Sequence, residues 1–489
     1  MNITQEALDA ILPKVTKPAR YTGHEWNSVV KDWDQVEVKI ALAYPDVYEV
    51  GMSNLGLAIL YDILNREEGI LAERVYAPWI DMEKAMRQAG IPLYSLESRR
   101  PLAEFDIIGF SLQHELNYTN VLNMLDLAGL SPLAAERRDT DPLVIGGGSC
   151  TYNAEPMADF FDLLVIGEGE EVLLELVRAY RRLRIAKAGF LREAARIEGV
   201  YVPSLYDVRY HDDGTIAAVE PLVPEARPCV RKRIVDSLPP APTRLVVPYI
   251  EVIHDRAMVE IQRGCTQGCR FCQAGFIYRP LRERPAEEVL ETVDAILRET
   301  GYEEVALLSL SSTDYSEIKP LVRELTTRYQ HPPLAISLPS LRIDSFSVEL
   351  AEMFQGRRRT GLTFAPEAGS QRLRNVINKK VTEEDLLGTA EAAYSSGWRR
   401  IKLYFMVGLP GETPDDVARI ADLMEDLTRS SRKTRFKLSL NPFVPRPHTP
   451  FQWERQFSVK EIYERIGFLK DLSLIHISEP TRLGMISYA

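Results

Sequence analysis

The chain has 489 residues, of which 45% are hydrophobic, and carries a formal net charge of −11. This length provides for two or three domains, and the hydrophobic content excludes a chain that stays disordered. The negative charge argues against a surface devoted to nucleic acid, because phosphate binding requires clustered Lys and Arg.

From Val36 to about Arg182, within an expected N-terminal domain of residues 1–198, the chain alternates strand-like and helix-like patterns. Four short, mostly apolar runs are typical of strands buried on both faces of a parallel sheet. Helical patterns such as residues 56–67 and 120–128 lie between them, so we expect an open α/β domain. Its glycine-bearing loops 146–150 and 167–170 follow strands, at the edge where such sheets bind ligands. The expected strands are Val36–Tyr44, Phe105–Leu112, Pro142–Gly148 and Phe161–Glu170.

Residues 199–256 are expected to link this domain to the next. The runs Val200–Tyr210 and Thr215–Pro221, separated by Asp212-Asp213-Gly214, predict a β-hairpin. The Pro-rich stretch 238–248 that follows is typical of a connector.

Residues 257–471 repeat a strand–helix alternation six times. Six such units with right-handed crossovers curl into a partial (β/α)6 barrel, with its chemistry at the carboxyl ends of the strands. Residues 382–385 fit a helix capping box, and residues 413–416 place a proline in a first helical turn. The expected strands are Ala257–Gln262, Glu304–Leu310, Leu334–Leu338, Gly361–Ala365, Ile401–Val407 and Phe436–Asn441.

Three of the five cysteines lie directly after the first of these six strands. Cys265, Cys269 and Cys272 form a CxxxCxxC pattern, in which three thiolates can wrap one 4Fe–4S cluster and leave its fourth iron open. An open iron can chelate the amine and carboxylate of S-adenosylmethionine. Zinc is the competing interpretation, with His254 or Cys229 as a fourth ligand. A dithiol switch would explain only two of the three cysteines.

The cysteine content also indicates the cellular compartment of the protein. Five cysteines with three of them close together do not make a disulfide framework, and the N-terminus lacks the layout of a secretory signal. No apolar run is long enough to span a membrane. We therefore expect a cytoplasmic protein without a membrane partner.

Around these cysteines, and at successive motifs from Ala257 to Trp453, the chain resembles the radical S-adenosylmethionine (SAM) superfamily. The resemblance implies a 4Fe–4S cluster, SAM and an electron donor such as flavodoxin or ferredoxin. It implies an enzyme that generates a 5′-deoxyadenosyl radical for hydrogen abstraction from, or methylation of, an unactivated carbon. The substrate, a small molecule or RNA, is left open.

The same resemblance implies a set of cofactor-binding residues. The GGE motif that the family carries after its second strand is replaced here by LSLSSTDY. This replacement leaves several candidates for binding the amine of SAM. Structural alternatives stay open: Arg342 pairs with Asp344, Glu367 serves a helix N-terminus, and the glycines only shape a turn. The candidates are Phe271 for adenine; Ser311, Ser312 and Asp314 for the amine; Ser340 and Arg342 for the carboxylate; Glu367 for the ribose; and Gly408 and Gly411 for adenine.

The N-terminal domain resembles the cobalamin-binding-like domain of an uncharacterised subgroup of the same superfamily, through VIGGGSCTYNAEP and DLLVIGEGEE. The DxHxxG motif that ligates cobalt from below is absent, and His114 does not supply it. Two cases therefore stay open: the domain binds cobalamin, or it recognises substrate without cobalamin. In the first case, loops 146–150 and 167–170 should face the barrel mouth. A third alternative, from another class, is a non-catalytic zinc- or RNA-binding protein.

The last residues, Leu472–Ala489, resemble a translated sequencing-library adapter. The helical pattern of residues 459–469 is abandoned abruptly at Leu472. We expect a non-native tail that makes few core contacts, because it was not selected to match this fold.

Overall fold

The computed structural model describes residues 3, 5–183, 186–343, 362–430 and 434–472. It divides into two compact units, Met1–Asp255 with Arg298–Gly301, and Arg256–Leu297 with Tyr302–Ala489. Almost all of the adapter-like tail, residues 473–489, lies outside the described residues.

The first unit is built on a six-stranded sheet with the strand order β2-β1-β3-β4-β5-β6. Neighbouring strands are parallel except β6, which is antiparallel to β5. The four strands expected from the sequence are present as β1, β3, β4 and β5. The strands are β1 (Val38–Tyr44), β2 (Ile70–Tyr76), β3 (Ile107–Ser111), β4 (Leu143–Gly147), β5 (Leu163–Val165) and β6 (Val200–Tyr201).

Strand β2 was missed by the sequence analysis because two charged residues interrupt its apolar run. Glu73 and Arg74 are nevertheless buried, with 2% and 3% of their surface exposed. The Arg74 guanidinium lies 2.7 Å from a Glu25 carboxylate oxygen and 2.6 Å from one of Glu97. These pairings supply the counter-charges that a buried guanidinium requires, and they cannot be seen in a local pattern.

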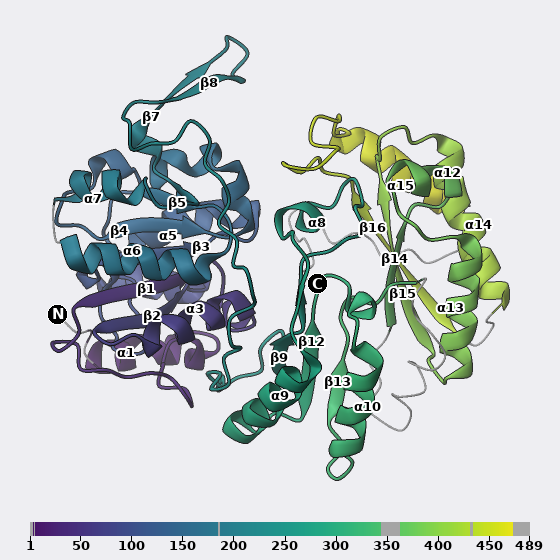
Figure 1. The fold of residues 1–489 in the computed structure, drawn as a ribbon, viewed down its shortest axis with the longest axis horizontal. Coiled ribbons are helices and arrows are strands. Elements are labelled where there is room, and N and C mark those ends of the chain that lie inside the picture. Colours follow the sequence, from purple (N-terminus) through teal and green to yellow (C-terminus); the bar gives the residue numbers. More distant parts are fainter. Residues whose placement is uncertain (1–2, 4, 184–185, 344–361, 431–433, 473–489) are drawn as a thin grey trace. The chain divides into compact units, whose positions relative to one another are not determined.

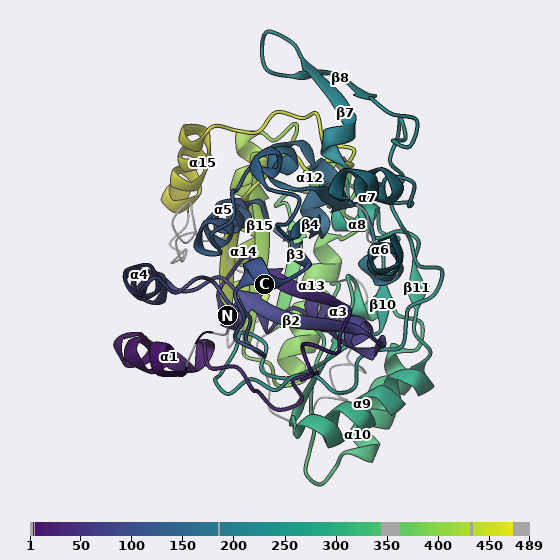
Figure 2. The same cartoon turned by 90° about the vertical axis from the view of Figure 1, so that its left-hand side faces the viewer.

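Helices cover both faces of this sheet (Figure 2). One core includes buried residues of α1, α4 and α5, and the other includes buried residues of α3, α6 and α7. Strand side chains alternate between the two cores, as Ala41 and Leu42 of β1 do. The helices are α1 (Gln5–Ile11), α2 (Tyr48–Gly51), α3 (Leu55–Arg66), α4 (Ile80–Ala89), α5 (Tyr118–Leu127), α6 (Gly169–Leu183) and α7 (Lys187–Ala194).

The segment predicted as a hairpin and linker belongs to the first unit. The first predicted strand of the hairpin is divided, because Pro203 lacks a backbone N–H and begins a short 3-10 turn. The part before the turn is β6, which pairs with β5. The part after it is β7 (Tyr206–Tyr210), which forms the hairpin with β8 (Ile216–Pro221).

The second unit contains all six predicted strands, in two parallel sheets of three. The sheet orders are β13-β12-β9 and β14-β15-β16. The helix expected between β13 and β14 falls on residues 344–361, outside the described residues. The six strands are β9 (Ala257–Glu260), β12 (Glu304–Leu308), β13 (Ala335–Ser337), β14 (Leu362–Glu367), β15 (Arg400–Val407) and β16 (Arg435–Pro442); β10 (Gln262–Arg263) and β11 (Arg282–Glu283) form a small antiparallel pair.

Two helices of the second unit begin where the sequence predicts. Thr382 and Asp385 form the expected capping box at α13, and Pro414 begins α14. Among the described residues, no helix has the length and apolar composition to cross a membrane. The helices are α8 (Ala274–Ile277), α9 (Ala286–Thr300), α10 (Ile318–Arg328), α12 (Gln371–Val376), α13 (Glu383–Ser395), α14 (Pro414–Ser430) and α15 (Val459–Leu472).

Candidate functional site

The three-cysteine loop lies between β10 and α8, just past the carboxyl end of β9. Its first turn requires Gly264, which has a φ of 92°. A Cβ there would lie 2.6 Å from the carbonyl oxygen of Pro280 and 2.8 Å from that of Tyr278. The base of the loop is therefore held tightly against the chain that leaves it.

The tip of the cysteine loop is bonded to the end of α12. The Asn378 side-chain amide donates to the carbonyl of Gly268 at 2.8 Å. The backbone N–H of Arg270 donates to the carbonyl of Ile377 at 3.0 Å. These two bonds join the first strand's loop to the segment that follows the fourth strand.

The three thiols share one electrostatic environment. Burial raises the pKa of the Cys269 and Cys272 thiols, and the nearby charge of Cys265 acts in the same direction on both. The ammonium group of Lys379 opposes the rise at both cysteines. All five cysteines of the chain are free thiols.

The number and spacing of the cysteines are the features that favour a cluster at this loop. Among the residues that the structure describes, no three His, Cys, Asp or Glu side chains are grouped closely enough to bind one ion. A zinc site needs its ligands around one centre, whereas in a cubane each cysteine binds a different iron. The CxxxCxxC spacing is typical of the second arrangement.

A carboxylate next to the cysteine loop brings several predicted residues together. One oxygen of Asp314 accepts hydrogen bonds from the Gln267 amide and the Ser311 hydroxyl, each at 2.7 Å. Its other oxygen lies 3.7 Å from Nε of Arg342. The structure thus pairs Arg342 with Asp314, and Asp344, the partner considered from the sequence, lies outside the described residues.

The two remaining serine candidates, Ser312 and Ser340, form hydrogen bonds within and between the loops. Ser312 is fully buried, and its hydroxyl donates to the carbonyl of Leu307 at 3.4 Å and accepts a bond from Ser309 at 3.0 Å. The Ser312 N–H donates to the carbonyl of Ser340 at 3.0 Å. These bonds connect the loops that follow β12 and β13.

Glu367 ends strand β14 in a left-handed conformation, with a φ of 68°. Burial raises its pKa to about 7, and the charge of Lys379 opposes that rise. The Lys379 ammonium lies 3.9 Å from the Glu367 carboxylate. Glu367 is not the N-cap of α12, because the Ser370 hydroxyl accepts the bond from the first turn.

Lys379 was missed by the sequence analysis. A lysine just after a short helix is common simply because it complements the helix dipole, so its position carries little signal. Its charge acts on Cys269 and Cys272, and it is close to Glu367. It therefore lies in the group of candidate residues around the thiols.

The glycine-rich turn after β15 is closed by Glu412. A carboxylate oxygen of Glu412 accepts bonds from the N–H groups of Gly408 and Leu409, at 2.9 and 3.4 Å. Gly408 and Gly411 have φ angles of 82° and 72°, which the turn requires. Phe271, from the cysteine loop, packs against the apolar cluster that contains Leu409.

Comparison with protein-family models gives two matches. Residues 259–424 match the model of the radical SAM superfamily, and residues 56–203 match the model of radical SAM proteins, N-terminal. An uncharacterized protein of Methanocaldococcus jannaschii is 30% identical over 420 residues, which cover 85% of this chain and 79% of that protein. The chain belongs to the radical SAM superfamily. It is a radical SAM enzyme, which uses a 4Fe–4S cluster and SAM.

Other radical SAM proteins are similar over a smaller share of the chain or at lower identity. A threonylcarbamoyladenosine tRNA methylthiotransferase of Chlamydia pneumoniae is 24% identical over 45% of this chain and 52% of its own length. Among solved structures, the methyltransferase TsrM of Kitasatospora setae, with cobalamin and a [4Fe-4S] cluster bound, has a TM-score of 0.59 at 17% identity, covering 84% of this chain and 73% of TsrM. The cobalamin-dependent enzyme OxsB has a TM-score of 0.51 at 14% identity, covering 89% and 56%. These likenesses confirm the predicted α/β fold, with an open sheet domain followed by a partial barrel.

In the two glycine-bearing loops of the radical SAM enzyme's first unit, the individual glycines differ in what surrounds them. At Gly167, a Cβ would lie 2.2 Å from the carbonyl oxygen of Arg233, so the linker backbone takes up that space. Gly148 similarly faces the carbonyl of Leu112 at 2.6 Å. A Cβ at Gly147, in contrast, would meet no atom within 4 Å. Packing within the chain therefore explains the glycines at 148 and 167.

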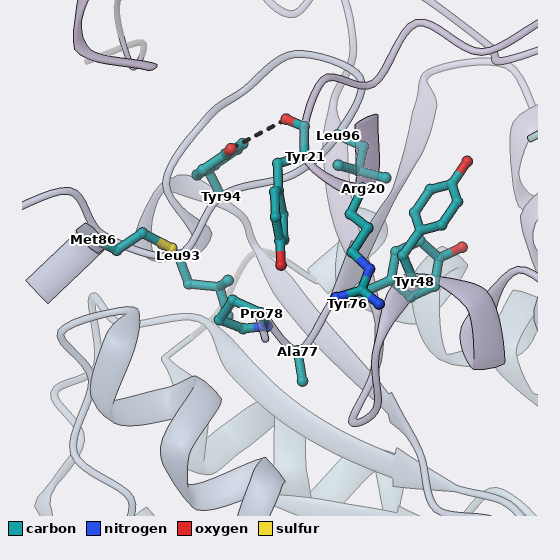
Figure 3. A pocket seen from close by; sticks show the side chains of 10 residues that line it. All are labelled: Arg20, Tyr21, Tyr48, Tyr76, Ala77, Pro78, Met86, Leu93, Tyr94 and Leu96. Carbon is teal, nitrogen blue, oxygen red and sulfur yellow. Dashed lines mark hydrogen bonds between the residues drawn. The ribbon is translucent and has the colours of Figure 1, made fainter. Parts of the chain in front are cut away.

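A pocket of the first unit lies beyond the carboxyl end of β2 (Figure 3). The polar groups that line it are engaged with other parts of the protein. Arg20 is paired with Glu49 at 2.7 Å, and the Tyr94 hydroxyl donates to the Tyr21 carbonyl at 3.1 Å. We assign no ligand to this pocket. Its lining residues are Arg20, Tyr21, Tyr48, Tyr76, Ala77, Pro78, Met86, Leu93, Tyr94 and Leu96.

Proposed function

We propose that Cys265, Cys269 and Cys272 hold the 4Fe–4S cluster of this enzyme. When bound, the cluster supplies the electron that cleaves SAM reductively. The observation that carries the proposal is the bonding of the cysteine loop to candidate residues from other strands. Gln267 joins it to Asp314 after β12, and the end of α12 joins it to the segment beyond β14.

The residues around the loop offer complementary groups for SAM. The Asp314 carboxylate, oriented by Gln267 and Ser311, can accept bonds from the amine. Arg342 and Lys379 supply positive charge for the carboxylate. The remaining candidates are Glu367 for the ribose hydroxyls, Phe271 and the Gly408–Gly411 turn for adenine, and Ser312 and Ser340 as backbone links between the loops.

The test is anaerobic reconstitution followed by measurement of 5′-deoxyadenosine. The wild type, supplied with SAM and a reductant such as reduced flavodoxin or ferredoxin, should form 5′-deoxyadenosine. Cys269→Ala should form none and should bind less iron, because an incomplete triad cannot hold the open-iron cubane. Cys229→Ala, an exposed cysteine outside the loop, is the matched control and should behave as wild type. Normal turnover by Cys269→Ala would refute the ligand assignment.

A second proposal concerns methyl transfer with cobalamin bound to the first unit. It is supported by the fold shared with TsrM and OxsB, and by the open surroundings of Gly147. The filled space beside Gly148 and Gly167 gives it no support. Reconstitution with hydroxocobalamin followed by gel filtration decides whether the first unit binds cobalamin. Retained corrinoid absorbance would favour methylation; its absence, with the cluster intact, would leave the first unit as a substrate-recognition domain.

We propose that the enzyme acts in the cytoplasm, in keeping with its free thiols. Its substrate is a small molecule or RNA. The short basic segment at residues 227–233 gives RNA little support. Arg233 is paired with Glu171 and Glu175 at 2.6 and 2.7 Å, and Arg227 donates to a backbone carbonyl. A direct check is co-purification of RNA, compared before and after a high-salt wash.

A further inference from the structure

The sheet β14-β15-β16 has one apolar face and one polar face. In β15, Ile401, Leu403, Phe405 and Val407 are buried in a core shared with α13, α14 and α15, and these helices lie on one side of the sheet (Figure 1). The alternate residues of the strand are partly or fully exposed and begin with Arg400 and Lys402. Because side chains alternate along a strand, they belong to the face turned away from the helices.

Four cations stand in two facing pairs on this polar face. In the register of the parallel strands, Arg400 of β15 lies opposite Arg435 of β16, and Lys402 lies opposite Lys437. Like charges directly opposite one another destabilise a sheet. Within the part of the chain that the structure describes, none of the four has a carboxylate within ion-pairing distance. A counter-charge from outside these residues would remove the repulsion.

Hydroxyl groups extend this cationic surface toward the carboxyl ends of the strands. The Lys402 ammonium donates to the Tyr404 hydroxyl and lies 4.2 Å from the centroid of its ring. Ser439 of β16 is opposite Tyr404 in the register. Ammonium and hydroxyl donors side by side are the groups that bind carboxylate and phosphate oxygens.

We propose that Lys402 and Lys437 bind an anionic end, a carboxylate or a phosphate, of the enzyme's substrate. The inference rests on the proposed function, in which SAM binds to the loops at the carboxyl ends of these same strands. From Lys402 to Gly408 the strand advances six residues, or about 20 Å at the usual rise per residue. The substrate is therefore an elongated molecule, with its anionic group far from its reacting carbon.

The test is the thermal stability of the full chain in defined anions. Sodium phosphate and sodium glutarate are compared with sodium chloride at equal ionic strength. The wild type should gain about 3 °C in Tm in at least one of the two anions, as a ligand that binds only the folded state does. A gain with phosphate alone identifies a phosphate site, and a gain with glutarate alone identifies a carboxylate site. No gain over chloride in either would overturn the proposal.

Variants locate the effect and separate it from the cofactor. Lys402→Met/Lys437→Met should lose the gain, whereas Lys84→Met/Lys460→Met, at exposed lysines elsewhere, should keep it. A gain that persists in the first double variant would also overturn the proposal. Cys269→Ala should keep the anion response while losing 5′-deoxyadenosine formation, so the anion site and the cluster assignment can fail independently.

Discussion

Replacing Glu412 by Gln should change how the stability of the enzyme depends on pH. The Glu412 side chain is 1% exposed, and burial raises its pKa from 4.5 to about 7, against the bonds from Gly408 and Leu409. The folded protein therefore binds a proton between these two pH values that the unfolded chain has lost. A carboxyl group with a raised pKa makes the protein most stable below pH 4.5, and this stability is lost as the pH rises to 7. The loss is roughly 3 kcal/mol.

Glutamine can accept the same two backbone bonds without ever becoming charged. The variant should lie within about 1 kcal/mol of the wild type at pH 5 and exceed it at pH 8, by up to about 3 kcal/mol in the free energy of unfolding. The assay is urea denaturation followed by circular dichroism at pH 5, 6, 7 and 8. Because Glu367 titrates in the same range in both proteins, only the difference between them reports on Glu412.

Glu464→Gln is the matched control, since this carboxylate on α15 is 62% exposed. It should differ from the wild type by less than about 0.5 kcal/mol at every pH. A stability difference for Glu412→Gln that stays constant from pH 5 to 8 would refute the assignment of Glu412 as a buried carboxylate that closes the turn after β15.

Three further substitutions test other parts of the structure. Gly264→Ala should lower the bound iron, because its Cβ would lie 2.6 Å from the Pro280 carbonyl oxygen; iron analysis should show no loss for Gly388→Ala, where a Cβ meets open space. Arg74→Met should lower the free energy of unfolding in urea by about 3–5 kcal/mol, because it leaves two buried carboxylates without a counter-charge, and a loss below about 1 kcal/mol would contradict this. Lys379→Met should raise the KM for SAM in 5′-deoxyadenosine assays roughly tenfold, through the loss of one charge-assisted contact, and an unchanged KM would exclude such a contact.

The strands were predictable where their signal is local. The four expected strands of the first unit are largely continuous apolar runs, and the six of the second unit recur in a strand–helix alternation. All ten lie within a few residues of their expected positions. Strand β2 was not predictable in this way, because Arg74 is compensated by Glu25 and Glu97, which are distant in sequence. Buried charge pairs of this kind carry no periodic pattern.

The candidate site was predictable only in part, for the same reason. The cysteine spacing is a local pattern and was read directly, and so was the glycine-rich turn. The pairing of Arg342 with Asp314, and the position of Lys379 near the thiols, depend on loops brought together by separate strands. Side-chain partners across such loops are set by the packed barrel and cannot be chosen from spacing.

The linker backbone beside Gly167 determines where the enzyme can be divided. The N–H of Arg233 donates to the carbonyl of Ile166 at 2.8 Å, its carbonyl accepts from Glu168 at 3.0 Å, and the Glu168 carboxylate accepts from Val235 at 2.7 Å. Arg233 thus forms an isolated parallel bridge with Gly167, just past the end of β5. A fragment that ends at residue 198 would lose these bonds as well as β6, and would expose the edge of β5 to aggregation. An expressed first unit should therefore run to Asp255.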